Sequence, residues 1–290
     1  MKHSATLTGI LLLLGIVGLG SAQPASAPTV SDMIARARAY LGGEAALAAV
    51  HSVHFSGTLE TGDATPAGAK PEKLGVEIIF QKPYQQRIVV TGAGSVETTA
   101  LDGSTAWEGK QESRDRNRWQ LNVLRPDQVK QLQANTWENL NFYQGIEQRG
   151  GTVAALGSAS VDGQPAAKLV FTHDAEIVYY HYFDPGSGKL LLTETAQGLS
   201  IREEGEIVAG GVRFPRKVIQ TTKSLDSHGQ PVEQKLILSF DKITLNETFP
   251  ESDFDLPLVS SSNQDPAEPG SPAPVGESPN PPPASGPAGK

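Results

Sequence analysis

The sequence predicts a mainly β (α+β) protein, built on one long, curved antiparallel sheet with a few helices on one side. Residues 166–245 alternate between strand-like runs and turns, with almost no helical periodicity. The turns are short and rich in Gly, Pro, Asp and Ser, as at residues 184–188 and 227–231. Turns of this length cannot hold the crossover that parallel strands need, so neighbouring strands are expected to be antiparallel.

Composition divides the chain into three regions, residues 1–22, 23–258 and 259–290. The first has the charged start, short apolar run and small residues of a secretory signal peptide, with cleavage expected after Ala22 or Ala27. Its apolar run is about half the roughly 20 residues that a membrane-spanning helix needs. The last region is rich in Pro, Ser, Gly and Ala, which predicts a disordered Pro-rich tail. Binding of this tail to a partner domain is the alternative.

Charge and cysteine content exclude several classes of function. The chain has no cysteine, so disulfides, thiolate metal sites and cysteine nucleophiles are excluded. Its formal net charge of −8 at pH 7 argues against nucleic acid binding. The one basic cluster, at residues 114–118, is interpreted as a solvated loop between strands. The alternative is a rim that contacts anionic lipid head groups, with Trp119 at the membrane surface.

Helical patterns occur near the N-terminus and in the middle of the chain. A helix is expected over residues 31–41, capped by Ser31 and ended by Gly42 and Gly43, and a short helix over residues 44–50. Pro126 suits the first turn of a helix over residues 126–140. The polar face of that helix is expected to point to water: Gln128, Gln131, Asn135 and Asn139.

About ten strands are expected around the middle helix. Those before it cover residues 53–59, 75–80, 85–91, 96–101 and 105–108, and a long polar connection at 61–73 separates the first two. After the helix, residues 199–207 alternate as one half-buried strand, in which Glu203 and Glu204 point to opposite faces. In the last strand, 232–245, the apolar positions change phase, which predicts a bulge near Asp241 and Lys242.

Four segments, in this order along the chain, resemble the periplasmic carriers of outer-membrane lipoproteins and their receptors, the LolA- and LolB-like proteins. Residues 102–107 are similar to their D-G-x-x-x-W hairpin, and residues 182–190 contain a turn similar to D-x-x-T/S-G-x-L. Residues 211–215 are similar to a strand start that ends in proline, and residues 243–254 to the closing segment. The resemblance covers about residues 53–257. The Pro-rich tail departs from the family pattern, and no residue is assigned as the arginine that gates the family's lid.

The resemblance implies an unclosed β-barrel covered by helices on its concave face, with an apolar cavity for acyl chains. It implies a non-enzymatic carrier of the periplasm, a monomer without cofactor or metal, that sorts outer-membrane lipoproteins or binds lipid. Its partners would be acyl chains of lipid or lipoprotein, the membrane surface as a peripheral contact, and an envelope protein. The alternative is a cell-envelope scaffold that interacts through its Pro-rich tail.

Large apolar side chains are the candidates for contact with a ligand in such a cavity. Residues 177–183 are apolar on both faces, which agrees with a strand that packs under helices on one face and lines a void on the other. The expected ligand-binding residues are Trp107, Trp119, Phe142, Tyr143, Ile177 and Tyr179. Ordinary core packing is the alternative for each of them.

Two patterns could indicate an enzyme or a metal site, but the residues around them do not support either. His51 and His54 lie at a junction of helix and strand, and no third ligand follows at a recognisable spacing. His173 and Asp174 could form a triad with Ser187 or Ser158, but no G-x-S-x-G elbow supports a hydrolase. The sequence therefore favours a binding protein.

Overall fold

The computed structural model describes residues 28–62, 72–225 and 231–257. Its first six strands are β1 (Ser52–Gly62), β2 (Lys73–Gln81), β3 (Gln85–Thr91), β4 (Ser95–Asp102), β5 (Thr105–Glu112) and β6 (Asp115–Val123). The strands that follow are β7 (Thr152–Val161), β8 (Gln164–Asp174), β9 (Ile177–Phe183), β10 (Leu190–Thr195), β11 (Leu199–Glu204), β14 (Lys217–Leu225) and β15 (Pro231–Leu245). The expected signal peptide and tail, and most of the connection at 61–73, lie outside the described residues.

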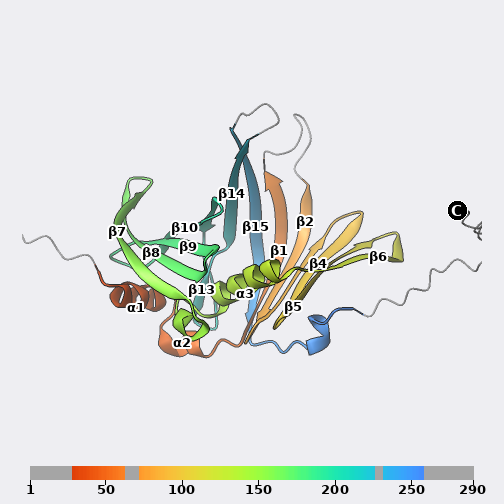
Figure 1. Ribbon diagram of the computed structural model, residues 1–290, viewed down its shortest axis with the longest axis horizontal. Coiled ribbons are helices and arrows are strands. Elements are labelled where there is room, and N and C mark those ends of the chain that lie inside the picture. The colour runs from red at the N-terminus through yellow and green to blue at the C-terminus, as the bar shows by residue number, and fades with distance from the viewer. Residues whose placement is uncertain (1–27, 63–71, 226–230, 258–290) are drawn as a thin grey trace, which may run out of the picture. The chain divides into compact units, whose positions relative to one another are not determined.

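These thirteen strands form one curved antiparallel sheet, in the order β6-β5-β4-β3-β2-β1-β15-β14-β11-β10-β9-β8-β7 (Figure 1). Within the described part of the chain the sheet does not close, because β6 and β7 remain as its edges. The predicted mainly β architecture with an open, curved sheet is therefore confirmed. The estimate of about ten strands was too low; β6, for example, covers residues that were expected to form a loop.

The middle of the sheet is the pair formed by β1 and β15. Its register shifts where Ser56 pairs with Lys242 and Gly57 pairs with Phe240, which leaves Asp241 as the extra residue of a bulge. The bulge predicted near Asp241 and Lys242 is confirmed. Because of the bulge, apolar side chains before and after Asp241 face the same hydrophobic core. They are Leu238, Phe240 and Ile243.

Two short helices, α1 (Val30–Leu41) and α2 (Glu44–Ala48), precede the sheet. The N-cap of α1 is Thr29 rather than the expected Ser31. The Thr29 hydroxyl oxygen accepts a hydrogen bond from the N–H of Asp32 at 3.1 Å, and the Asp32 carboxylate accepts one from the N–H of Thr29. This reciprocal capping box favours Thr29 over Ser31. Gly42 ends the helix as predicted.

The turn between β9 and β10 packs closely against α1. Asp184 accepts hydrogen bonds from both the N–H and the hydroxyl of Ser187, at 2.6 and 2.7 Å. Gly188 has a φ of +80°, and a Cβ added there would lie 2.4 Å from the carbonyl carbon of Arg36 in α1. Glycine is therefore required at this position both by the backbone conformation and by the lack of space.

The longest helix, α3 (Pro126–Leu140), starts at Pro126 as predicted and runs across the face of the sheet, in contact with β2, β3 and β4 (Figure 1). On one side, Gln133 donates a hydrogen bond to the carbonyl of Gly103 at 2.8 Å. On the other, Gln131 donates one to the hydroxyl of Tyr179 in β9 at 2.9 Å. The helix therefore connects strands from the two halves of the sheet.

None of the helices among the described residues has the length and apolar character that crossing a bilayer requires.

Two local expectations were wrong. The segment expected as one strand over 199–207 is divided at Gly205, which has a φ of +65°. β11 ends before it, and β12 (Ile207–Ala209) pairs with β13 (Val212–Phe214) in a separate hairpin.

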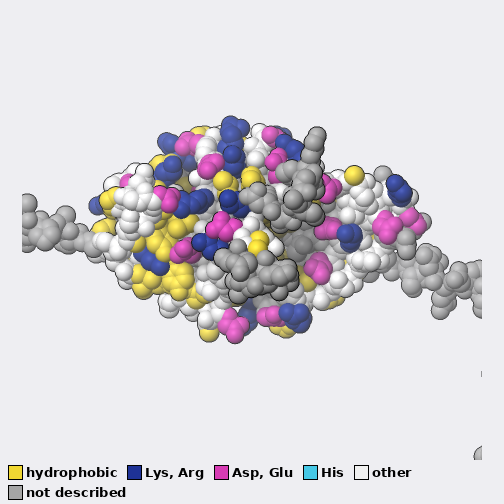
Figure 2. Space-filling model, turned by 90° about the horizontal axis from the view of Figure 1, so that it is seen from above, with side chains coloured by type: hydrophobic (Ala, Val, Ile, Leu, Met, Phe, Trp, Pro, Cys, Tyr) yellow, Lys and Arg dark blue, Asp and Glu magenta, His cyan; other side chains and the backbone are white. Residues whose placement is uncertain are grey.

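The basic cluster at residues 114–118, which was expected as a loop, lies mostly at the start of β6 instead. Figure 2 shows Lys and Arg interspersed with Asp and Glu over one face of the molecule, rather than gathered in one basic patch.

Candidate ligand-binding cavity

The sheet, α3, the end of α1 and the β12–β13 hairpin line a cavity of about 440 Å³. The wall formed by β1, β2, β3, β14 and β15 is almost entirely apolar, with Gln220 as its polar exception. Its apolar residues are Phe55, Leu59, Val76, Ile78, Phe80, Ile88, Val90, Val218, Leu236, Leu238 and Phe240. Most of them belong to one core cluster, so this wall is fixed by close packing behind the cavity surface.

The opposite wall, formed by β9–β11 and α3, contains the polar groups. His181, Thr193 and Glu203 come from the strands, and Lys189 directly precedes β10. From α3 come Glu138, Asn135 and Asn139. The two halves of the sheet therefore give the cavity an apolar wall and a polar wall.

Phe142 and Tyr143, which directly follow α3, line the cavity with an unusual backbone. Their φ angles are +49° and +69°, a region that costs a residue other than glycine about 1–3 kcal/mol. The buried Arg38 of α1 holds this segment, because its guanidinium donates hydrogen bonds to the carbonyls of Phe142 at 2.9 Å and Asn141 at 3.2 Å. The same guanidinium forms an ion pair with Glu44. We infer that these contacts offset the cost of the turn that directs two aromatic side chains to the cavity.

The six side chains expected to bind a ligand are divided by the structure. Phe142, Tyr143 and Tyr179 line the cavity. The other three are not among its lining residues. Trp107 is buried near the first edge of the sheet and donates a hydrogen bond to the carbonyl of Phe254, Trp119 lies on the edge strand β6, and Ile177 packs in a core cluster with α1 and α3.

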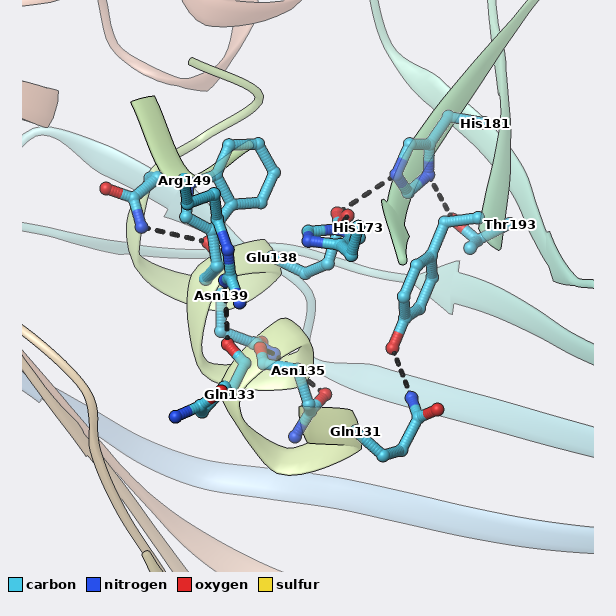
Figure 3. Close-up of polar contacts among 12 residues, drawn as sticks. Gln131, Gln133, Asn135, Glu138, Asn139, Arg149, His173, His181 and Thr193 are labelled. Carbon is cyan, nitrogen blue, oxygen red and sulfur yellow. Dashed lines mark hydrogen bonds and ion pairs between the residues drawn. The ribbon is translucent and has the colours of Figure 1, made fainter. Parts of the chain in front are cut away.

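A buried cluster of charge centres on Glu138 of α3 (Figure 3). Its carboxylate accepts hydrogen bonds from Nε2 of His173 at 2.6 Å and from Nε2 of His181 at 3.0 Å. Nδ1 of His181 is 2.8 Å from the hydroxyl of Thr193. The side chains of Glu138, His173 and His181 are only 10%, 1% and 4% exposed, so these contacts are largely shielded from water.

Two opposing effects set the pKa of Glu138. Burial alone raises it, because a carboxylate is poorly stabilised away from water. The charge of His181 and the hydrogen bonds from His173 and His181 act in the other direction and prevail, so the pKa is lowered to about 2. The cluster therefore favours an ionised Glu138 on the inner side of α3.

The polar face of α3 does not simply point to water, as the sequence led us to expect. Asn135 and Asn139 line the cavity, and Asn135 also donates a hydrogen bond to Gln86 of β3 at 3.0 Å. Gln131 is partly buried against Tyr179. The sequence reasoning also missed Glu138, His181, Glu203 and Lys189. A signal was present for His181, since it interrupts an otherwise apolar strand.

The residues considered for a catalytic triad lie in separate contacts. His173 bonds to Glu138, whereas Asp174 pairs with Lys130 at 2.7 Å and Ser187 bonds to Asp184. No triad is assembled from these groups. Across the described ranges, no group of three or more His, Asp and Glu side chains is arranged to hold a metal ion.

No family model matches the sequence, and no curated protein is similar to it in sequence. Solved structures are similar in fold. A LolA superfamily protein from Nitrosomonas europaea has a TM-score of 0.50 at 13% identity, over 79% of this chain and 99% of its own. The fold is LolA-like. The resemblance that the four motifs predicted is thus confirmed at the level of the fold.

Two further structures are similar to the LolA-like fold of this chain at lower scores. A DUF1329 family protein from Desulfovibrio piger is 8% identical, over 78% of this chain and 97% of its own, with a TM-score of 0.49. A domain from Vibrio parahaemolyticus, described as an outer membrane lipoprotein-sorting protein domain, is 8% identical, over 77% of this chain and 94% of its own, with a TM-score of 0.47. At such identities the likeness concerns the fold alone.

Proposed function

We propose that the protein is a non-enzymatic, monomeric carrier or sensor of an apolar ligand in the periplasm, and that its cavity holds an acyl chain of a lipid or lipoprotein. The observation that carries this proposal is the apolar wall of the 440 Å³ cavity, to which five strands contribute. Ligand pockets commonly measure about 300–1,000 Å³. Each methylene group moved from water to such a wall contributes about 0.8 kcal/mol before ordering costs, so a long chain supplies ample affinity.

The LolA-like fold supports a carrier, since this is the role that the resemblance implies, and it makes an envelope protein and the membrane surface the expected partners. The alternative, a scaffold acting through residues 259–290, is less well supported. A scaffold needs no space inside its sheet, whereas this sheet lines a cavity. The tail itself lies outside the described residues.

Filling the cavity tests the proposal. Ile88 and Val89 are neighbours on β3, but only Ile88 lines the cavity, because successive residues of a strand point to opposite faces. Wild type should bind a C16 fatty acid at micromolar concentration, and Ile88→Trp should weaken this binding about tenfold or more, as expected when several methylene contacts are lost. Val89→Trp should bind like wild type. Native mass spectrometry and titration calorimetry measure both.

The carrier proposal fails if wild type binds neither fatty acid nor lipid at micromolar concentration. It also fails if Ile88→Trp, correctly folded by circular dichroism, binds the fatty acid as well as Val89→Trp does.

A further inference from the structure

Two charged side chains at the polar wall of the cavity have no partner among the described residues. Neither the carboxyl group of Glu203 nor the ammonium group of Lys189 forms a hydrogen bond or an ion pair with a described residue, although both residues line the cavity. The neighbouring Glu204, on the other face of β11, is paired with Lys217 at 3.3 Å. A carboxyl group and an ammonium group without partners can both bind the charged groups of a ligand.

Glu203 lines the cavity, and its surface is exposed rather than packed against other side chains. Burial raises the pKa of its carboxyl group, while the nearby charges of His181 and Lys189 act to lower it. The carboxyl group of Glu203 therefore lines the cavity as a hydrogen-bond acceptor that no side chain in the described part of the chain occupies.

The other charged groups that line the cavity are already compensated. Glu138 is held by two histidines. Arg213 and Glu206 form an ion pair with each other at 3.0 Å, and Arg213 also lies over the ring of Tyr40. Among the cavity-lining residues that the structure describes, one cation, Lys189, and one carboxyl group, Glu203, remain for a ligand on the same wall.

We propose that this wall binds the head group of a single-chain zwitterionic phospholipid, with its phosphate at Lys189 and its primary ammonium group at Glu203. The inference rests on the proposed carrier function and specifies its ligand. An ammonium group donates charge-assisted hydrogen bonds to a carboxylate, and a lysine ammonium binds phosphate as a point charge. The acyl chain then lies against the apolar wall. A head group with only negative charge would place no donor cation at Glu203.

One acyl chain is expected in the cavity rather than two. Pockets of this size bury most of a drug-sized ligand, and a single long chain with a small head group is of that size. The suitable probes are therefore lysophosphatidylethanolamine, lysophosphatidylglycerol and a monoacylglycerol, all with the same C16 chain and each used below its micelle concentration.

Calorimetric titration of the folded protein with the three probes tests the inference. Wild type should bind lysophosphatidylethanolamine about tenfold or more tightly than lysophosphatidylglycerol, the effect expected of a hydrogen bond between charged groups. Glu203→Gln should remove this preference, and Glu204→Gln, the control on the outer face of the same strand, should keep it. Lys189→Gln should weaken both phospholipids while leaving the monoacylglycerol unchanged.

The inference is overturned if wild type binds the two phospholipids equally, or if Glu203→Gln retains the preference. In both cases monoacylglycerol binding would leave the carrier function standing. If none of the three probes binds to wild type, the carrier function fails as well, so the two failures are distinguishable. Should Glu203→Gln not fold, the Lys189→Gln comparison still decides: equal affinity of this variant and wild type for both phospholipids overturns the inference.

Discussion

The carboxylate of Glu138 accepts a hydrogen bond from Nε2 of His173 at 2.6 Å, in the layer between α3 and the sheet. The two residues are 35 positions apart in the sequence. His181, on the neighbouring strand β9, donates a second hydrogen bond to the same carboxylate. One carboxylate therefore attaches the helix that covers the cavity to two strands below it. The free energy of unfolding should therefore depend strongly on this carboxylate.

Replacing Glu138 by alanine should be strongly destabilising. The change leaves Nε2 of both His173 and His181 without a partner in a nearly water-free layer. Breaking a buried charged pair typically costs about 3–5 kcal/mol. Urea denaturation at neutral pH measures the free energy of unfolding. The control is Glu97→Ala, since Glu97 is 56% exposed in its ion pair with Lys110 and such a pair contributes about 1 kcal/mol or less. Similar losses for the two variants would contradict this account.

The contribution of Glu138 should also depend on pH. The folded protein lowers its pKa from 4.5 to about 2, so between these values the folded state binds fewer protons than the unfolded state. The stabilisation is therefore fully present above about pH 4.5 and is lost as the pH falls towards about 2. The difference in unfolding free energy between wild type and Glu138→Gln should shrink over this interval in urea denaturation. A difference that stays constant from pH 5 to about pH 2 would refute the assignment.

Gly188→Ala should be much more harmful than Gly163→Ala. The two glycines have nearly the same φ, +80° and +81°. In both variants alanine would adopt a left-handed backbone conformation, which destabilises the folded state by about 1–2 kcal/mol. Only at Gly188 would the added Cβ meet the backbone of α1, and such overpacking costs about 1–3 kcal/mol more. At Gly163 nothing lies within 4 Å. Thermal unfolding of the two variants gives the comparison, and equal shifts in Tm would show that α1 does not pack on this turn.

Arg38→Lys should loosen the aromatic wall of the cavity while keeping the positive charge. Lysine lacks the planar fork with which Arg38 reaches Glu44 and the carbonyls of Asn141 and Phe142 together. Leaving such buried groups unsatisfied costs about 1–3 kcal/mol. Hydrogen exchange should become faster at residues 141–144 in this variant. Arg36→Lys, on the same helix and more exposed, serves as the control and should leave exchange there unchanged.

Local patterns predicted much of the fold. The strand at 85–91 and the helix at 126–140 were predicted with the bounds that the structure has, and the phase change in the last strand located the bulge at Asp241. Such features depend on neighbours in the sequence. The N-cap was misplaced by two residues because a second capping residue, Thr29, has its partner Asp32 at the right spacing.

The candidate site was harder to predict, for a physical reason. Periodicity shows that α3 has a polar face but not what lies opposite it, and here a polar cavity wall takes the place of water. Glu138, His173 and His181 meet only because the sheet order places β8 and β9 under α3. Aromatic residues were reasonable candidates, yet aromatic character alone cannot separate Tyr143, which lines the cavity, from Trp107, which does not.

The β1–β15 pair at the centre of the sheet has a consequence for how the protein is made. His54 and Glu247, which are in contact beside this pair, are 193 residues apart in the sequence. Pairings between such distant segments form slowly, because a long loop has to close first. As the chain emerges from its N-terminus, β1 must therefore wait, with one edge unpaired, until nearly all of the folded part has followed. The cavity wall spans both sides of this pair, so a chain that stops before β15 would have no binding site.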